Sequence, residues 1–374
     1  MSRDERREDG ARSPSLDRVI RSSELILTCG PGGVGKTTTA AALGVAAARA
    51  GRKTVVVTVD PARRLADALG LDDGAAADEP HRVKGVTKRA TDGELWALML
   101  DAEQTFDRLV REQSGSRKQA EAVLNNPVYQ AISGSLSGAQ EYMAVERLHQ
   151  LHVSGDWDLV IVDTPPSRHA IDLLEAPDRL VGFLSHPVYR TLTVGQRTFA
   201  KITDAASSMF LWAVKRLAGP QIVEDTVEFF RSLANIEGGL RHRAKQVSEL
   251  LRGDDTSFIV VSSPRAEAVG EAEHLLDAIS TKDFPLGGLV VNLIHPLPDP
   301  LSDDDEDLLD GIEDGPLADQ LVWHTELTSL ALAEREELVE LERLAGDAPI
   351  IELPLLDVDI HDLPGLVDLS ARLV

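Results

Sequence analysis

A glycine-rich stretch ends in a lysine followed by three threonines, and its spacing matches the pattern G-x-x-x-x-G-K-T from Gly30 to Thr37. Glycines let successive backbone N–H groups approach phosphate oxygens where a Cβ would intrude, and a helix start adds further free N–H groups. In such a loop the lysine, Lys36, neutralises the β- and γ-phosphates of a nucleotide, and Thr37 ligates Mg²⁺. The pattern predicts nucleoside triphosphate binding by the residues Gly30, Gly32, Gly33, Val34, Gly35, Lys36, Thr37 and Thr38.

The segments on either side of this glycine loop are those that a phosphate-binding loop requires. The apolar run Leu25–Leu27 precedes it and predicts a strand, and an alanine-rich run from Thr39 to Ala50 follows it and predicts a helix. The alternative is a glycine-rich turn between strand and helix that binds no ligand. The complete spacing in this context favours phosphate binding.

Two aspartates end predicted strands further along the chain. Asp60 ends the β-branched run that begins at Lys53, and Asp163 ends the apolar run that begins at Leu159. Because ligands of open α/β sheets bind at the carboxyl ends of the strands, both carboxylates should face the same crevice as the glycine loop. An apolar run that ends in Asp has the Walker B form, whose carboxylate holds Mg²⁺, usually through a water molecule.

Strands and helices alternate along most of the chain, which favours an α/β fold: a P-loop NTPase with a mostly parallel central sheet flanked by helices. Helical patterns also indicate an inserted helical subdomain from about 102–154 and 176–252. The further predicted strands are 95–101, 257–262, 287–292 and 349–353, and the further predicted helices are 265–279, 328–345 and a closing one from 365.

The composition narrows the class of protein. The chain has 374 residues, 43% of them hydrophobic, and a formal charge of −24, which disfavours nucleic acid and anionic membrane surfaces as partners. Cys29 is the single cysteine, so no intrachain disulfide can form. No apolar run approaches the roughly 18–20 residues that cross a bilayer, and we expect a soluble, cytoplasmic protein. Residues 1–20 are expected to form a disordered tail and 302–315 an acidic loop, with the P-loop domain over 21–374.

Many of the chain's few aromatic residues lie in the second helical segment, between Phe183 and Phe230. They could form the core of a helical subdomain. They could instead line a partly open apolar groove for a client helix. Both readings stay open at this stage.

Several motifs occur together in an order that resembles the ArsA-type ATPases, which include the arsenite-pump ATPase and the ATPases that target tail-anchored membrane proteins. Besides the glycine loop, they are Thr58-Val59-Asp60-Pro61-Ala62 with Leu65, Asp67 and Gly70; Asp163-Thr164-Pro165-Pro166 with Leu173-Leu174; Ser262-Ser263-Pro264-Arg265-Ala266-Glu267-Ala268; Val291-Asn292; and Leu353-Pro354-Leu355-Leu356. The resemblance runs from about residue 22 to the C-terminus.

This resemblance implies ATP as the nucleotide, Mg²⁺ as its metal, and a role for four further residues. Asp60 matches the aspartate that orients the attacking water, and Asp163 matches the magnesium aspartate. Asn292 matches the asparagine that reads the adenine base, and Pro354 lies where the family packs its backbone against that base. Read without the resemblance, Asp60 could cap a helix start and Asn292 a strand end.

The chain departs from the family pattern at several positions. Pro31 stands where the family has a second lysine, which crosses the dimer interface to the partner's phosphates. The metalloid-binding and zinc-binding cysteines of family members are absent. Arg63, Arg64 or Arg168 could supply the missing cation. Arg63 also replaces a common histidine, and Ser167-Arg168 replace threonine-glycine, which implies a difference in how these two segments move.

These observations predict a Mg²⁺-dependent ATPase whose nucleotide state opens and closes a dimer that handles an apolar client or partner. The dimer would be a homodimer or a heterodimer with a lysine-bearing ArsA-type paralogue. The alternative is an ATP-binding regulatory subunit with little hydrolysis of its own. A partition-type ATPase that positions DNA is disfavoured by the acidic charge.

Overall fold

Eight strands form one central sheet in a computed structural model that describes residues 15–59, 64–71, 77–86, 89, 91–126, 139–186, 237–300 and 315–374. The strand order is β3-β4-β2-β5-β1-β6-β7-β8. All neighbours pair parallel except β3 and β4, which pair antiparallel. The strands are β1 (Leu25–Cys29), β2 (Lys53–Thr58), β3 (His81–Arg82), β4 (Glu94–Met99), β5 (Leu159–Asp163), β6 (Thr256–Ser262), β7 (Leu286–Ile294) and β8 (Ile350–Pro354). This arrangement confirms the predicted mostly parallel α/β sheet.

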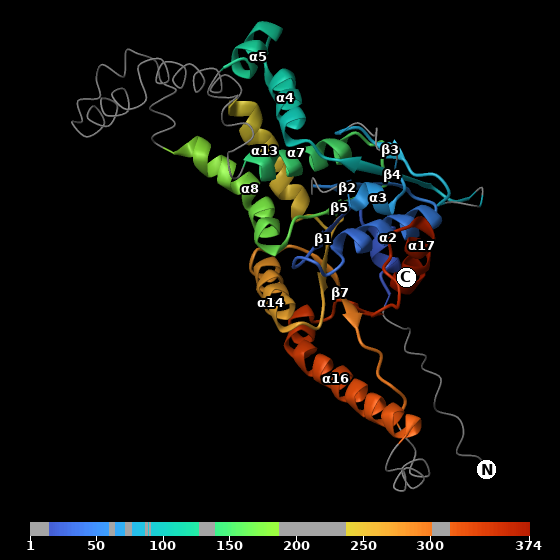
Figure 1. The fold of residues 1–374 in the computed structure, drawn as a ribbon. Coiled ribbons are helices and arrows are strands. Elements are labelled where there is room, and N and C mark those ends of the chain that lie inside the picture. Colours follow the sequence, from blue (N-terminus) through green and yellow to red (C-terminus); the bar gives the residue numbers. More distant parts are fainter. Residues whose placement is uncertain are drawn as a thin grey trace, which may run out of the picture.

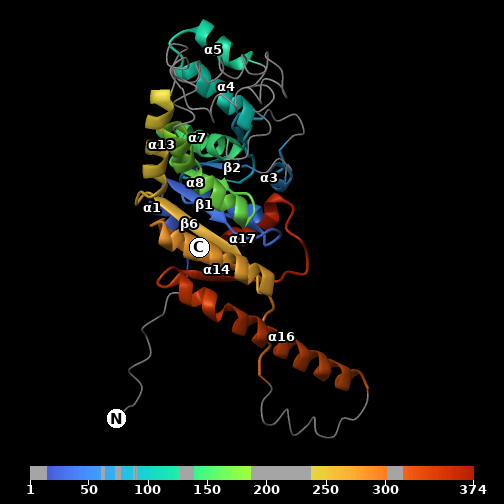
Figure 2. The same cartoon turned by 90° about the vertical axis from the view of Figure 1, so that its left-hand side faces the viewer.

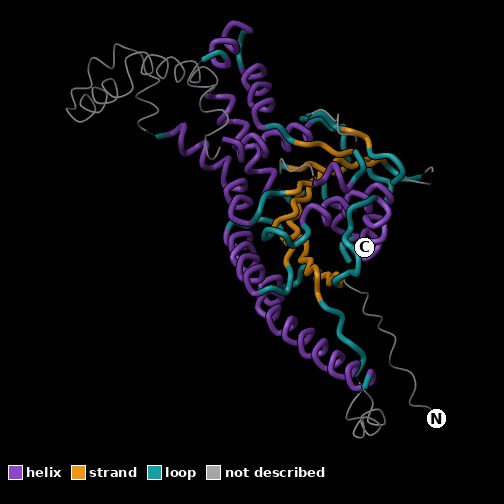
Figure 3. The backbone as a smooth tube through the Cα atoms, viewed as in Figure 1, coloured by secondary structure: helices purple, strands orange, loops and turns teal. Residues whose placement is uncertain are grey.

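Helices cover both faces of this sheet (Figure 1, Figure 3). Because successive side chains of a strand point to opposite faces, Leu25 and Leu27 of β1 join one core cluster and Ile26 joins the other. The described helices are α1 (Asp17–Ser22), α2 (Lys36–Arg49), α3 (Arg64–Ala68), α4 (Ala102–Gln113), α5 (Arg117–Leu124), α7 (Ala139–Val153), α8 (Ser167–Ser185), α13 (Glu237–Leu251), α14 (Ala266–Thr281), α16 (Pro316–Ala345) and α17 (Leu363–Leu373). Helices α2 and α17 pack on one face, and α7, α8, α13 and α14 on the other.

Helix α2 lies close against the sheet, which explains its alanine-rich sequence. Every residue from Thr39 to Ala48 is buried, and a Cβ at Gly44 would press on Val56 and Leu95. The helix begins at Lys36, three residues before the predicted start at Thr39. The cause is that the helix grows directly out of the glycine loop, so the loop's last residues already belong to its first turn.

The prediction of a disordered tail over residues 1–20 is wrong for residues 17–20, because helix α1 covers Asp17–Ser22. Leu16 and Ile20 are buried, and the Leu16 N–H donates to the Leu373 carbonyl at 2.8 Å. Two apolar residues four positions apart are enough to dock this short helix on the core, although charged residues surround them in the sequence. Residues 1–14 lie outside the described part of the chain.

Helix α16 also differs from its prediction, since it begins at Pro316 rather than at 328. Its buried residues all lie in its C-terminal half, from Ala331 to Ala345, and its first half extends away from the sheet (Figure 2). The acidic loop predicted over 302–315 lies outside the described residues except for Gly315, which precedes this helix.

Helices α4, α5, α7, α8 and α13 form a helical layer on one side of the sheet, and α4 and α5 extend beyond its edge (Figure 1). Helices α4, α5, α7 and α13 fall in the two ranges predicted for the helical subdomain, whereas α8 begins at Ser167, before the second range. The subdomain boundaries stay a prediction because 127–138 and 187–236 are outside the described residues. Phe183, on α8, is 47% exposed. The other aromatic residues of the suggested client groove lie within 187–236. No helix of the described residues is long and apolar enough to span a membrane.

One buried carboxylate joins this helical layer to the edge of the sheet. Asp78 precedes β3, is 1% exposed and has a left-handed backbone with φ of 63°. It accepts from Arg108 of α4 at 2.6 Å and from Arg147 of α7 at 3.1 Å. Its N–H donates to the Met99 carbonyl at 2.7 Å. The loop before β3, β4 and two helices therefore meet at one ion-pair cluster.

We expect Asp78→Asn to lower the free energy of unfolding by about 3 kcal/mol, because it leaves two partly buried guanidinium groups without their counter-charge. Asparagine tolerates the left-handed backbone, so the change isolates the charge. Urea unfolding followed by circular dichroism measures the difference. The control is Arg117→Ala, which breaks a surface pair whose arginine is 92% exposed and should cost less than about 0.5 kcal/mol. Equal losses in both variants would contradict the role given to Asp78.

Candidate functional site

The glycine loop runs from the end of β1 into α2, and two of its glycines, Gly30 and Gly35, stand where a side chain could not fit. A Cβ at Gly30 would overlap the carbonyl oxygen of Val261 in β6, and a Cβ at Gly35 would overlap the side chain of Asn292. Gly33 and Gly35 have φ of 76° and 92°, in the left-handed region that favours glycine. The loop conformation therefore depends on the glycine pattern found in the sequence.

Cys29 ends β1 just before this loop and is fully buried. Burial raises the pKa of its thiol to about 12. A thiol with such a pKa stays protonated at neutral pH and is a poor nucleophile. Cys29 is thus a small buried residue of the core.

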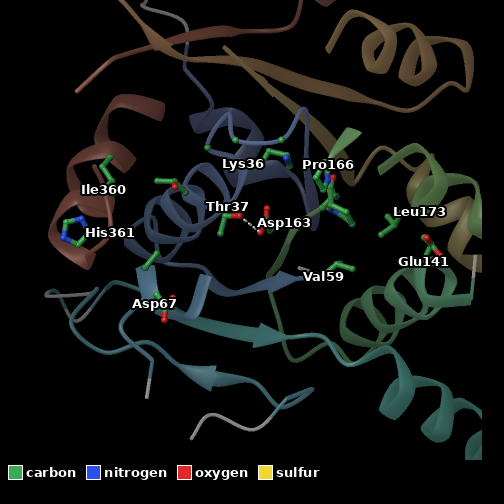
Figure 4. A pocket seen from close by; sticks show the side chains of 17 residues that line it. Lys36, Thr37, Val59, Asp67, Glu141, Asp163, Pro166, Leu173, Ile360 and His361 are labelled. Carbon is green, nitrogen blue, oxygen red and sulfur yellow. Dashed lines mark hydrogen bonds between the residues drawn. The ribbon is translucent and has the colours of Figure 1, made fainter. Parts of the chain in front are cut away.

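The loop borders a cavity of about 1000 Å³. Figure 4 shows Lys36, Thr37 and Asp163 at its centre, Ile360 and His361 on one side, and Glu141 and Leu173 on the other. The cavity is lined by Gly32, Gly33, Gly35, Lys36, Thr37, Thr38, Val59, Asp67, Ala68, Glu141, Asp163, Thr164, Pro165, Pro166, Leu173, Ile360 and His361. Side chains from the sheet, the helical layer and the segment before α17 therefore surround one space.

Lys36 folds back over the loop. Its Nζ donates to the carbonyl oxygen of Pro31 at 2.5 Å, and the residue is 8% exposed. Pro31 is itself buried, and it presents this carbonyl to the lysine. A cation is thus held at the mouth of a loop whose backbone N–H groups can also bind an anion.

Asp163 lies at the carboxyl end of β5 and is 1% exposed. Its Oδ2 accepts from the hydroxyl of Thr37 at 2.7 Å and from the hydroxyl of Thr58 at 3.0 Å. A carboxylate beside a threonine hydroxyl is an oxygen donor set of the kind that Mg²⁺ prefers. Thr37 and Asp163 could therefore hold this metal, with Thr58 orienting the carboxylate from the neighbouring strand.

The turn after Asp163 is anchored to the sheet and to a helix. The Thr164 hydroxyl donates to the Thr28 carbonyl at 2.8 Å, and the Val59 N–H donates to the Asp163 carbonyl at 3.3 Å. Ser167, the first residue of α8, donates its hydroxyl to Glu271 of α14. The turn that carries the acidic group is thus continuous with the helical layer.

A second cavity of about 400 Å³ adjoins the first and shares Gly33, Gly35, Thr38 and Ile360 with it. It contains both residues that the resemblance assigned to a base, Asn292 and Pro354. Its other lining residues are Leu293, Leu353, Leu355, Leu356, Val358, Asp359, Leu369 and Arg372. The two cavities together extend the space beside the glycine loop toward Asn292 and the segment 353–356.

The backbone near Asn292 is irregular. Leu293 has φ of 64°, which a bulky residue rarely adopts, and the pairing of β7 with β8 shifts between Val291 and Ile294. The side-chain Nδ2 of Asn292 donates to the Val34 carbonyl at 2.9 Å. Asn292 thus contacts the glycine loop itself, which the sequence reasoning did not predict.

The sequence reasoning also missed three other residues that border or orient the site. Thr58, Ile360 and His361 line or orient the site, and they lie near the carboxyl ends of strands β2 and β8, which is the signal that could have found them. Asp60 and Arg63 lie outside the described residues, so their roles stay predictions.

Comparison with known proteins gives a family and several distant relatives. A family model described as anion-transporting ATPase matches residues 23–309. The chain is 24% identical over 371 residues to the ATPase ASNA1 homolog of Dictyostelium discoideum, an alignment that covers 96% of this chain and 93% of that protein. It is 27% identical over 364 residues to the ATPase GET3C of Arabidopsis thaliana, covering 93% of this chain and 81% of the relative. The family match includes the glycine loop and strands β1 to β7, and the chain belongs to the ArsA family of anion-transporting ATPases.

Proposed function

We propose that this protein binds ATP with Mg²⁺ and hydrolyses it to ADP and phosphate. The observation that carries the proposal is the meeting of Lys36, Thr37 and Asp163 on one cavity at the glycine loop. The adjoining cavity, with Asn292 and four apolar or proline residues from 353–356, suits a flat base better than a second phosphate. The chain's membership of an ATPase family also supports ATP as the nucleotide.

Each residue of the site has a separate part in the proposed reaction. Lys36 and the loop N–H groups bind the β- and γ-phosphates, while Thr37 and Asp163 hold the metal. When bound, Mg²⁺ neutralises charge on the phosphate oxygens. We assign to Asp60 the orientation of the attacking water, as the family resemblance implies. Phosphoryl transfer to water then needs position and charge rather than a covalent intermediate.

We also propose that the nucleotide state opens and closes a dimer of two chains. The same change would move the helical layer, which would contact an apolar client helix. The support is the continuity between the Asp163 turn and α8, which packs against α7, α13 and α14. The second chain is a homodimer partner or a lysine-bearing ArsA-type paralogue. The net charge of −24 disfavours nucleic acid as a partner. We place the protein in the cytoplasm.

Pro31 favours a second candidate, an ATP-binding regulatory subunit with little hydrolysis of its own. Proline has neither a charge nor an N–H, and this one directs its carbonyl to Lys36. A cation supplied across an interface is worth on the order of 10³–10⁵ in rate in arginine-finger systems. Without one, a homodimer would hydrolyse ATP slowly.

We expect Lys36→Ala to abolish ATP turnover and to weaken ATP binding at least tenfold, because the loop loses its one phosphate-directed side-chain cation. Release of phosphate and calorimetric titration with Mg-ATP measure the two effects. Lys245→Ala, the same substitution on the exposed face of α13, is the control and should change neither. Unchanged binding and turnover in Lys36→Ala would overturn the proposed function.

We expect Asp163→Asn to reduce Mg²⁺-dependent turnover at least a hundredfold, because the variant loses the negative charge of the metal ligand. ATP binding measured in EDTA should change little, since the loop and Lys36 are intact. Asp156→Asn, at an exposed position before β5, is the matched control. An Asp163→Asn variant whose turnover keeps the Mg²⁺ dependence of the natural protein would show that the metal lies elsewhere.

Pro31→Lys separates the two candidate functions. If the isolated chain is slow because it lacks the interface cation, the lysine variant should hydrolyse ATP at least tenfold faster, and its specific activity should rise with protein concentration as dimers form. Turnover is measured over a series of protein concentrations for both proteins. Rapid turnover by the natural chain, with no gain in Pro31→Lys, would contradict the regulatory alternative.

A further inference from the structure

Asn292 is joined to the glycine loop by a direct hydrogen bond. Its Nδ2 donates to the Val34 carbonyl at 2.9 Å, and Val34 is 2% exposed. The two residues are 258 positions apart in the chain. The end of β7 therefore holds one particular peptide group of the loop, the one between Val34 and Gly35.

The packing around this peptide leaves little freedom for another arrangement. A Cβ on Gly35 would overlap Asn292 Nδ2, so the amide fills the space that every other residue at position 35 would need. On the other side, the left-handed backbone of Leu293 and the shifted pairing of β7 with β8 set the direction from which Asn292 approaches. The contact thus depends on special backbone geometry in both partners.

Fixing this carbonyl also fixes an N–H group. In a trans peptide the C=O of Val34 and the N–H of Gly35 point in opposite directions. When Asn292 holds the carbonyl toward itself, the Gly35 N–H must point away from Asn292. Gly35 borders the larger cavity beside Lys36 and Thr37, where phosphate-binding N–H groups are required.

We propose that Asn292 is a positioning residue for the phosphate-binding loop, in addition to any contact it makes with a base. This inference rests on the proposed ATP binding, and it assigns Asn292 a share of the affinity for phosphate groups alone. A side-chain amide has two N–H groups and an oxygen. One N–H holds the loop, and the remaining polar atoms stay available to the adjoining cavity.

The test compares a ligand that has a base with one that has none. Mg-ATP and Mg-tripolyphosphate are titrated calorimetrically into the full chain and into Asn292→Ala. If Asn292 holds the loop, the variant should bind tripolyphosphate about fivefold more weakly, the loss typical of one hydrogen bond, and should bind ATP more weakly by at least that factor. A loss for ATP with unchanged tripolyphosphate affinity would overturn the inference, as would no loss for either ligand.

Two further variants make the result specific. Leu355→Ala enlarges the second cavity, which is proposed to hold the base. It should weaken the binding of ATP but leave the affinity for tripolyphosphate unchanged. Asn292→Asp keeps the shape of the side chain but presents a carboxylate to the Val34 carbonyl, so it should weaken tripolyphosphate binding more than Asn292→Ala does. A smaller loss of tripolyphosphate affinity in Asn292→Asp than in Asn292→Ala would overturn the role of the donated hydrogen bond. Thermal unfolding midpoints within about 2 °C of the natural protein show that the variants are folded.

Failure of the proposed function gives a different pattern. A natural chain that binds neither Mg-ATP nor Mg-tripolyphosphate would overturn the nucleotide site itself. A natural chain that binds both ligands, together with an Asn292→Ala variant that matches it for tripolyphosphate, would overturn the positioning role alone.

Discussion

The site depends on the close approach of the Gly30 backbone to β6 at the centre of the sheet. Strand β1 lies between β5 and β6, so the chain that leaves β1 must pass directly against the Val261 carbonyl before it can turn into α2. A side chain at position 30 would prevent this passage. The same central position pairs Thr28 with Asp163 in register, and so brings Asp163 to Thr37 although the two are 126 residues apart.

The second cavity depends on an irregular strand end rather than on a loop. Strand β7 is paired on both sides, with β6 and with β8, and these pairings hold Leu293 in a conformation that costs on the order of 1–3 kcal/mol. Such a cost persists only where the surrounding structure determines the backbone. The base-side residues are therefore as firmly placed as the glycine loop, and Asn292 joins the two parts directly.

Local pattern was enough to predict some of this structure. The spacing of the glycine loop indicated phosphate binding, and the apolar run before Asp163 indicated a strand that ends in a metal-binding carboxylate. The structure places Thr37 and Asp163 in contact. The Asn292–Val34 hydrogen bond could not be predicted, because it joins distant segments through a backbone shift that leaves no sequence pattern. Leu16 and Ile20 were missed because charged neighbours obscure a spacing of four, and the position of Asp60 lies outside the described residues.

The turn after Asp163 connects the site to two helices at once. Ser167 begins α8, is 4% exposed, and bonds Glu271 of α14, whose carboxylate also lies near the positive N-terminal end of the α8 dipole. Helix α14 packs in turn on α16, and α8 packs on α7 and α13. Any displacement of the turn must therefore move α8 with it or break the Ser167–Glu271 hydrogen bond. Both partners lie on helices whose inner faces pack into the core, so this hydrogen bond is a direct mechanical link between the Asp163 turn and the helical layer.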